Sequence, residues 1–168
     1  MKDNQDKTRE EKESVYLETT VVSYYTFKLK KDNIIVLAHQ EITRQWWPIA
    51  IRRYNIFISD TVIDEVSSGD PDAAKRRLDE IKDFPRLEFN ENVEKLAQIY
   101  VDRLNIPEKS NLDAVHLAIA CMNNVDYIVT WNCTHLANGE IIKKLMKINE
   151  SLGIHTPIIC TPENLLEV

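Results

Sequence analysis

The stretch DYIVTWN, residues 126–132, contains a buried strand at 126–130 that is followed by Trp131 and the polar Asn132. Ile128 and Val129 are residue types favoured in strands that are covered on both faces. Small and apolar residues recur before this strand at 110–122 and predict a buried helix, and a second helix is expected after it, near 137–151. A strand between two helices indicates a parallel sheet, because parallel neighbours need a crossover connection.

The same alternation of strands and helices continues along the whole chain. Further strands are expected at 14–17, 55–59, 86–89 and 157–160, and further helices at 20–27, 32–54, 72–82 and 90–103. Pro48 predicts a kink in the long helix, and Thr61 with Asp64 has the spacing of a capping box for a helix that ends near Val66. The sequence therefore predicts an α/β fold: a three-layer α/β/α sandwich with a central parallel sheet.

Composition is that of one globular domain, with 168 residues, 43% hydrophobic residues and a net charge of −6. We expect residues 1–13 to be a mobile polar tail and residues 14–168 to form the domain. No stretch is long and apolar enough for a membrane span and no secretory signal opens the chain, so a cytoplasmic protein is expected. The three glycines form neither a GxGxxG nor a P-loop motif, which excludes those nucleotide-binding classes.

Cysteine and histidine positions leave one alternative metal site open. Three cysteines without an export signal are expected to be reduced thiols. Cys133 and His135, with His116 and Cys121, would be the ligands of a zinc site, although neither CxxC nor HxxxH spacing is present.

Four polar residues are expected at one rim of the sheet. Ligands of open parallel sheets bind beyond the carboxyl ends of the strands. Glu18 follows the first strand, Glu65 lies early in the helix after the second, Asp113 lies in the first turn of the helix at 110–122, and Asn132 lies just after the strand at 126–130. Taken singly, Asp113 is explained by the helix dipole, Asn132 by a turn and Glu65 by exposure to solvent. Glu18 is harder to explain in this way, because glutamate is not a preferred N-cap.

Three converging carboxylates point to a cation. Their charges repel and would raise their pKa values unless a positive group joined them. Mg²⁺ and Mn²⁺ prefer oxygen ligands and are often held by a few carboxylates plus a substrate phosphate. A cation of this kind activates water for attack on phosphorus, so the pattern predicts phosphodiester hydrolysis.

Four segments together resemble the motifs of PIN domains, a family of compact α/β/α nucleases that includes many VapC-type toxins of toxin–antitoxin operons. They are, in order, YLETT at 16–20, ISDTVIDEV at 58–66, DAVHLAIA at 113–120 and DYIVTWN at 126–132. The resemblance spans residues 15–160 or so. It implies an Mg²⁺- or Mn²⁺-dependent endoribonuclease that is the toxin of a type II toxin–antitoxin pair, with RNA as substrate, an antitoxin as protein partner and a homodimeric state.

The resemblance also assigns roles to residues. Glu18, Glu65 and Asp113 would be the metal ligands, and Asn132 would be the fourth catalytic position. Thr19 or Thr20 would hydrogen-bond the first carboxylate or the scissile phosphate. Glu18 and Asn132 stand where the family more often has aspartate, so the first ligand is longer and the fourth position is uncharged.

Further residues are candidates for supporting roles. His116, one turn after Asp113, either supports the site or is a structural histidine. Trp131 is a candidate for stacking on an RNA base, and Trp46 and Trp47 for the core or an interface. The negative net charge excludes a broadly basic RNA-binding surface. Nucleic-acid contacts are therefore expected from a local basic rim, formed by Lys28, Lys30, Lys31, Arg52 and Arg53.

Two other functions remain open. Asn132 favours a catalytically degenerate PIN domain that acts as a nucleic-acid or protein binding module. A metal-dependent phosphoesterase acting on a small phosphate ester would use the same carboxylates. RNA and a chromogenic phosphate ester, offered as substrates, would distinguish them.

Overall fold

The computed structural model describes residues 11–166, so most of the polar tail expected at 1–13 lies outside the described residues. Its sheet has four strands in the order β2-β1-β3-β4, and all neighbours are parallel. The strands are β1 (Ser14–Leu17), β2 (Asn55–Phe57), β3 (Tyr127–Val129) and β4 (Ile158–Cys160). The predicted parallel sheet is confirmed.

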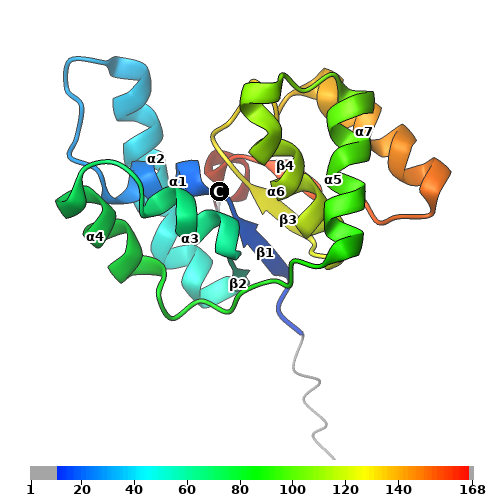
Figure 1. The fold of residues 1–168 in the computed structure, drawn as a ribbon. Coiled ribbons are helices and arrows are strands. Elements are labelled where there is room, and N and C mark those ends of the chain that lie inside the picture. The colour runs from blue at the N-terminus through cyan, green and yellow to red at the C-terminus, as the bar shows by residue number, and fades with distance from the viewer. Residues whose placement is uncertain (1–10, 167–168) are drawn as a thin grey trace, which may run out of the picture.

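Two groups of helices flank this sheet, and together they form the predicted α/β/α sandwich (Figure 1). One group consists of α1 (Thr19–Thr26), α2 (Ile34–Arg53), α3 (Asp60–Val66) and α4 (Pro71–Ile81). The other consists of α5 (Glu91–Leu104), α6 (Asn111–Met122) and α7 (Gly139–Leu152). Short 3₁₀ turns, η1 (Glu108–Ser110) and η2 (Pro162–Leu165), complete the described elements.

The centre of the sheet is the most deeply buried part of the fold. Val15 pairs with Ile56 on one side and with Tyr127 on the other, so β1 has neighbours on both edges. Tyr16, Leu17 and Ile128 are fully buried. Each such apolar side chain contributes about 1.5–3 kcal/mol when it leaves water. The chain order reverses at β1, so the carboxyl ends of β1 and β3 mark the position at which ligands of such sheets bind.

The prediction of a strand at 86–89 is wrong. A single bridge joins Ile58 to Arg86, made by Leu87 N–H to Ile58 O (2.7 Å) and Ile58 N–H to Pro85 O (3.0 Å). Pro85 has no N–H to extend the ladder. The next helix, α5, begins a few residues later, with Asn90 as its N-cap.

One local prediction about a helix also differs from the structure. Ser59, and not Thr61, is the N-cap of α3, and its hydroxyl accepts the N–H of Val62 (3.3 Å). Ser59 has the extended backbone that an N-cap requires, because it follows the strand directly. Helix α2 continues through Pro48 to Arg53.

The two neighbouring tryptophans of α2 belong to the core. Trp46 is fully buried, and Trp47 stacks on Tyr25 with ring centroids 4.1 Å apart. None of the helices in residues 11–166 is long and apolar enough to cross a membrane.

Candidate metal centre

Glu18 connects β1 to α1 and has its side chain almost entirely buried. Its N–H extends the ladder to Val129 O (3.1 Å), and its extended backbone makes it the N-cap of α1. The expectation that glutamate would not cap this helix is therefore wrong, because Glu18 Oε2 accepts the N–H of Thr20 (3.1 Å). The same oxygen accepts the hydroxyls of Thr20 (2.5 Å) and Thr130 (2.7 Å).

Burial dominates the electrostatics of Glu18. It raises the pKa of this carboxyl, and the charge of His116 with the donors on Thr20 and Thr130 reduces the increase. Within residues 11–166, Oε1 of Glu18 receives no hydrogen bond, so one oxygen of this carboxylate is held and the other is left for a ligand.

Glu65 lies in the C-terminal turn of α3, a helix of the same group as α1. The sequence predicted an early position in this helix, but α3 is short and ends at Val66. Oε2 of Glu65 accepts the hydroxyl of Thr19 (2.5 Å) and lies 2.8 Å from Nε2 of His116. Burial raises the pKa of Glu65, but the hydrogen bond and charge of His116 and the Thr19 hydroxyl outweigh it, so the pKa is lowered.

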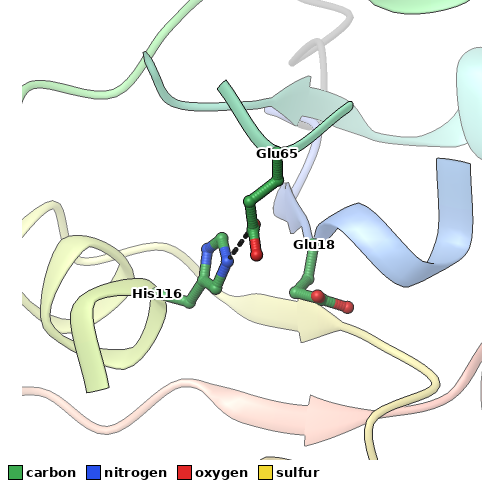
Figure 2. A group of neighbouring side chains, drawn as sticks. All are labelled: Glu18, Glu65 and His116. Carbon is green, nitrogen blue, oxygen red and sulfur yellow. Dashed lines mark hydrogen bonds and ion pairs between the residues drawn. The ribbon is translucent and has the colours of Figure 1, made fainter. Parts of the chain in front are cut away.

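His116 lies on α6 and is fully buried between the two glutamates and the sheet. Burial lowers the pKa of His116. The hydrogen bond to Glu65 and the charges of Glu18, Glu65 and Asp113 together outweigh burial, so the pKa is raised. Figure 2 shows Glu65 and His116 in contact, with Glu18 beside them at the start of α1. Ligand atoms of Glu18, Glu65 and His116 all lie within 4.8 Å of one another.

Asp113 and Asn132 form a second pair next to this group: Asp113 lies outside the set of ligand atoms within 4.8 Å of one another, although its charge interacts with those of Glu65 and His116. Asp113 lies in the first turn of α6, as predicted, and its Oδ1 accepts Nδ2 of Asn132 (3.0 Å). Burial raises the pKa of Asp113, and the Asn132 donor and the charge of His116 reduce the increase. The carbonyl oxygen of Asn132 accepts the backbone N–H groups of Thr134 (3.3 Å) and His135 (3.0 Å). Asn132 therefore supports Asp113 and uses its carbonyl oxygen within the following turn.

The donor set fits a hard divalent cation. Glu18, Glu65 and Asp113 each have one carboxylate oxygen held by protein donors. In the part of the chain that the structure describes, their other oxygens (Oε1, Oε1 and Oδ2) have no protein donor. Carboxylate oxygens without protein donors are the ligands that Mg²⁺ and Mn²⁺ prefer.

The basic residues expected to bind nucleic acid fall into two separate places. Lys28, Lys30 and Lys31 lie exposed between α1 and α2, where Gln40 bonds to Lys30 N–H (2.9 Å) and Lys28 O (3.1 Å). Arg52 and Arg53 form the last turn of α2, a helix about 30 Å long at 1.5 Å per residue. They lie next to the first residue of β2, at the amino-terminal end of the parallel strands, whereas Glu18 lies at the carboxyl end.

Trp131 is packed into the protein, so stacking on an RNA base is not supported. It is 8% exposed, its indole N–H donates to the Thr43 hydroxyl (2.7 Å), and its ring stacks on His39 with centroids 4.0 Å apart. This stack joins α2 to the residue before Asn132, and it places the segment with Lys28 to Lys31 on the side of the molecule that carries the site.

Two functional side chains were missed by sequence reasoning. Thr130 donates to Glu18, and Tyr16 bonds to Nδ1 of His116 (2.8 Å). Alternation along a strand could have found Tyr16, because it lies two residues before Glu18 and so on the same face. Thr130 could have been found as the residue with which the strand before Asn132 ends.

The zinc alternative is not assembled in the described residues. The group of potential metal ligands there is Glu18, Glu65 and His116, without a cysteine. Cys121 is buried and accepts a hydrogen bond from Asn149 (3.4 Å), whereas Cys133 is exposed.

No protein-family model matches this sequence, and no curated protein matches it significantly. Among solved structures, the chain is similar to one chain in the crystal structure of VapBC2 from Rickettsia felis bound to a DNA fragment from their promoter. The TM-score is 0.51 with 16% sequence identity, and the match covers 88% of this chain and 98% of that chain. Similarity at this identity concerns the fold, and it agrees with the PIN-like fold that the sequence motifs predicted.

Proposed function

We propose that this protein is a Mg²⁺- or Mn²⁺-dependent endoribonuclease and the toxin of a type II toxin–antitoxin pair. One observation carries the proposal. Glu18, Glu65 and Asp113 come from three separate elements, and each presents one oxygen without a protein donor at the carboxyl edge of a parallel sheet. Glu18 is 97% buried, and its unused Oε1 is not among the buried polar atoms without a partner, so this oxygen faces the open side of the site, where a cation can reach it.

The three carboxylates would hold the cation, which when bound would polarise a phosphate and lower the pKa of a water molecule. The protein's part is to keep the carboxylates in position and to favour their ionised form against the effect of burial. Thr20 and Thr130 do so for Glu18, and Thr19 does so for Glu65. The threonine assigned by the resemblance to the first carboxylate is therefore Thr20.

The substrate and partners follow from the same proposal. The exposed lysines 28, 30 and 31 would contact the phosphates of RNA on the side that carries the site. The similar structure is named as VapBC2 bound to promoter DNA, which supports an antitoxin as protein partner of this chain. A homodimer is proposed from the family resemblance alone.

A catalytically degenerate binding module is the second candidate. Asn132 gives its amide to Asp113 and its carbonyl to the turn, so the fourth position adds neither charge nor an unused oxygen. This would weaken a second metal more than the first, because the three carboxylates of the first remain.

The decisive experiment is cleavage of a labelled structured RNA in Mn²⁺ or in EDTA. It compares the parent protein with Asp113→Asn and with Asp102→Asn, an exposed position on α5 that serves as a matched control. We expect cleavage in Mn²⁺ by the parent and the control, and its loss in EDTA and in Asp113→Asn. Equal cleavage by all three would contradict the proposed site.

A chromogenic phosphate ester offered in parallel separates the remaining alternatives. Hydrolysis of the ester without cleavage of RNA would favour the phosphoesterase. Binding of RNA without any hydrolysis would favour the degenerate binding module.

A further inference from the structure

A continuous chain of hydrogen bonds runs from the interior of the protein to Glu65. Ser59 Oγ lies 2.7 Å from the Tyr16 hydroxyl, which lies 2.8 Å from Nδ1 of His116. Nε2 of His116 then lies 2.8 Å from Oε2 of Glu65. Ser59, Tyr16 and His116 are all buried, so water does not compete for these contacts.

The protons of this chain have one arrangement that satisfies all of them. Ser59 already accepts the N–H of Val62 (3.3 Å), so its hydroxyl proton is available for Tyr16. The Tyr16 hydroxyl then donates to Nδ1 of His116, and Nε2–H donates to Glu65. Burial raises the pKa of Tyr16, which keeps the phenol protonated and able to donate.

The opposite direction is unfavourable at both ends. It would leave the hydroxyl proton of Ser59 without an acceptor among the described residues. It would also set the lone pair of Nε2 against the carboxylate of Glu65 at 2.8 Å. A charged imidazolium keeps the proton on Nε2 as well, so Nε2 is the donor to Glu65 in both protonation states of the ring.

We propose that His116 is a positioning residue that orients Glu65, with Tyr16 and Ser59 setting its tautomer, and that it is not a ligand of the metal. The inference rests on the proposed function insofar as a cation binds beside Glu65. Distance alone would allow the opposite assignment, because the ligand atoms of Glu18, Glu65 and His116 are close enough to form a mixed nitrogen and oxygen site. A ligating Nε2 must have lost its proton, whereas here the proton holds Glu65 in place.

The assignment determines which metals the site prefers. Imidazole favours Zn²⁺, Ni²⁺ and Cu²⁺, whereas carboxylate and water favour Mg²⁺ and Mn²⁺. With His116 turned to Glu65, the proposed ligands are the unused oxygens of Glu18 and Glu65, with Asp113, which lies outside the 4.8 Å group, reaching the cation directly or through water. We therefore expect an all-oxygen site.

The first test uses the metal-free protein, in which ¹⁵N NMR distinguishes protonated from unprotonated ring nitrogens. His116 is assigned among the four histidines by the signal that His116→Gln removes. A proton on Nε2 with Nδ1 unprotonated supports the whole proposal, whereas protons on both nitrogens would support the positioning of Glu65 and overturn the role of Tyr16 and Ser59 in setting the tautomer. An unprotonated Nε2 with the proton on Nδ1 overturns the proposal, and none of these outcomes depends on metal binding.

The second test adds Mn²⁺ and detects coordinated nitrogen by pulsed EPR, with ¹⁴N- and ¹⁵N-labelled protein compared. The absence of coupling from a directly bound imidazole nitrogen supports the proposal, and such coupling, lost in His116→Gln, overturns it. Failure of the protein to bind Mn²⁺ would contradict the proposed function, and the NMR result would still decide the role of His116.

Two variants provide an independent measurement of Mn²⁺ affinity. His116→Gln retains a side-chain N–H that can reach Glu65, whereas His116→Leu has a similar size and no donor. A positioning role predicts affinity close to that of the parent for glutamine and a loss of about 10- to 100-fold for leucine. Equal losses in both, with circular dichroism showing that both are folded, would overturn the proposal. If the leucine variant does not fold, the two spectroscopic tests on the parent protein decide.

Discussion

The Thr130 hydroxyl at the end of β3 donates to Oε2 of Glu18 at the end of β1, across 112 residues of sequence (2.7 Å). Both residues are buried, and the hydroxyl of Thr130 also accepts the N–H of Asn132 (2.9 Å). One side chain thus connects the first carboxylate to the turn that holds Asn132 and, through it, Asp113. The parallel pairing of β1 and β3 brings these groups together at the site.

Replacing Thr130 by valine tests this connection, because valine has nearly the same shape and no hydroxyl. We expect unfolding to require about 1–3 kcal/mol less, since Glu18 loses a buried donor. Mn²⁺ affinity should fall by about 10-fold, since the carboxylate is no longer held. Chemical denaturation and calorimetric titration measure the two effects. Thr134→Val, at an exposed position, should change neither.

Metal binding should stabilise the parent protein and leave Glu65→Gln unaffected. A ligand present at 100 times its dissociation constant adds about 2.7 kcal/mol to the free energy of unfolding. We expect Mn²⁺ to raise the melting temperature of the parent and EDTA to reverse the increase. Glu88→Gln, an exposed change of the same kind, should respond as the parent does. A similar Mn²⁺ response in Glu65→Gln would exclude Glu65 as a ligand.

Asn132→Asp restores a charge at the fourth position and tests whether its absence limits the site. In EDTA the new carboxylate would replace the donor that Asp113 now has at 3.0 Å, and repulsion should raise the pKa of Asp113 and lower stability by about 1–3 kcal/mol. Mn²⁺ should reverse this loss, so the stabilisation by metal becomes larger than in the parent. Melting curves with and without Mn²⁺ measure it, and an unchanged response would show that position 132 does not contribute to the metal centre.

RNA binding should depend on the lysines between α1 and α2 and not on the arginines that end α2. Lys28→Gln with Lys31→Gln removes two charges on the side of the site, and we expect the slope of log affinity against log salt to decrease by about 1–2. Arg52→Gln with Arg53→Gln removes the same charge at the opposite sheet edge. Fluorescence anisotropy with an uncleaved RNA compares the two, and equal effects would argue for a diffuse electrostatic interaction.

Asp126 provides a pH-dependent contribution to stability that is independent of the metal centre. The backbone N–H and hydroxyl of Ser14 both donate to Oδ2 of Asp126 (2.7 Å each) and hold the pKa of that carboxyl below its usual value. A lowered pKa means that the stabilisation is present above the usual carboxyl pKa and is lost as the pH falls through the folded-state value. Asp126→Asn should cost about 0.5–1 kcal/mol at pH 7, because the site is largely exposed to solvent.

The measurement for Asp126 is denaturation of parent and variant at pH values from 7 down to the acid range, in EDTA. The difference in unfolding free energy between them should decrease as Asp126 becomes protonated in the parent. A difference that stays constant over this range would show that the charge of the carboxylate makes no contribution.

Sequence reasoning was most accurate where one short segment carries the information. Ile128 and Val129 predicted a buried strand, and the alternation around them predicted a parallel sheet; both are confirmed. The strand prediction for residues 86–89 failed, because a strand there needed a partner edge and Pro85 limited the pairing to one bridge. The prediction of Thr61 as the N-cap of α3 failed for a local reason, because Ser59 follows the strand directly and caps the helix instead.

The amino-acid sequence by itself determined that Glu18 ends a strand, that Asp113 opens a helix and that a parallel sheet brings strand ends together, because these depend on residue types within one or two turns. Only the tertiary structure decided which atoms meet. Tyr16 and His116 are 100 residues apart, and Glu65 and His116 are 51 apart. Hydrogen-bond partners at such distances are chosen by tertiary packing, such as that of α3 against α6, which no local pattern encodes.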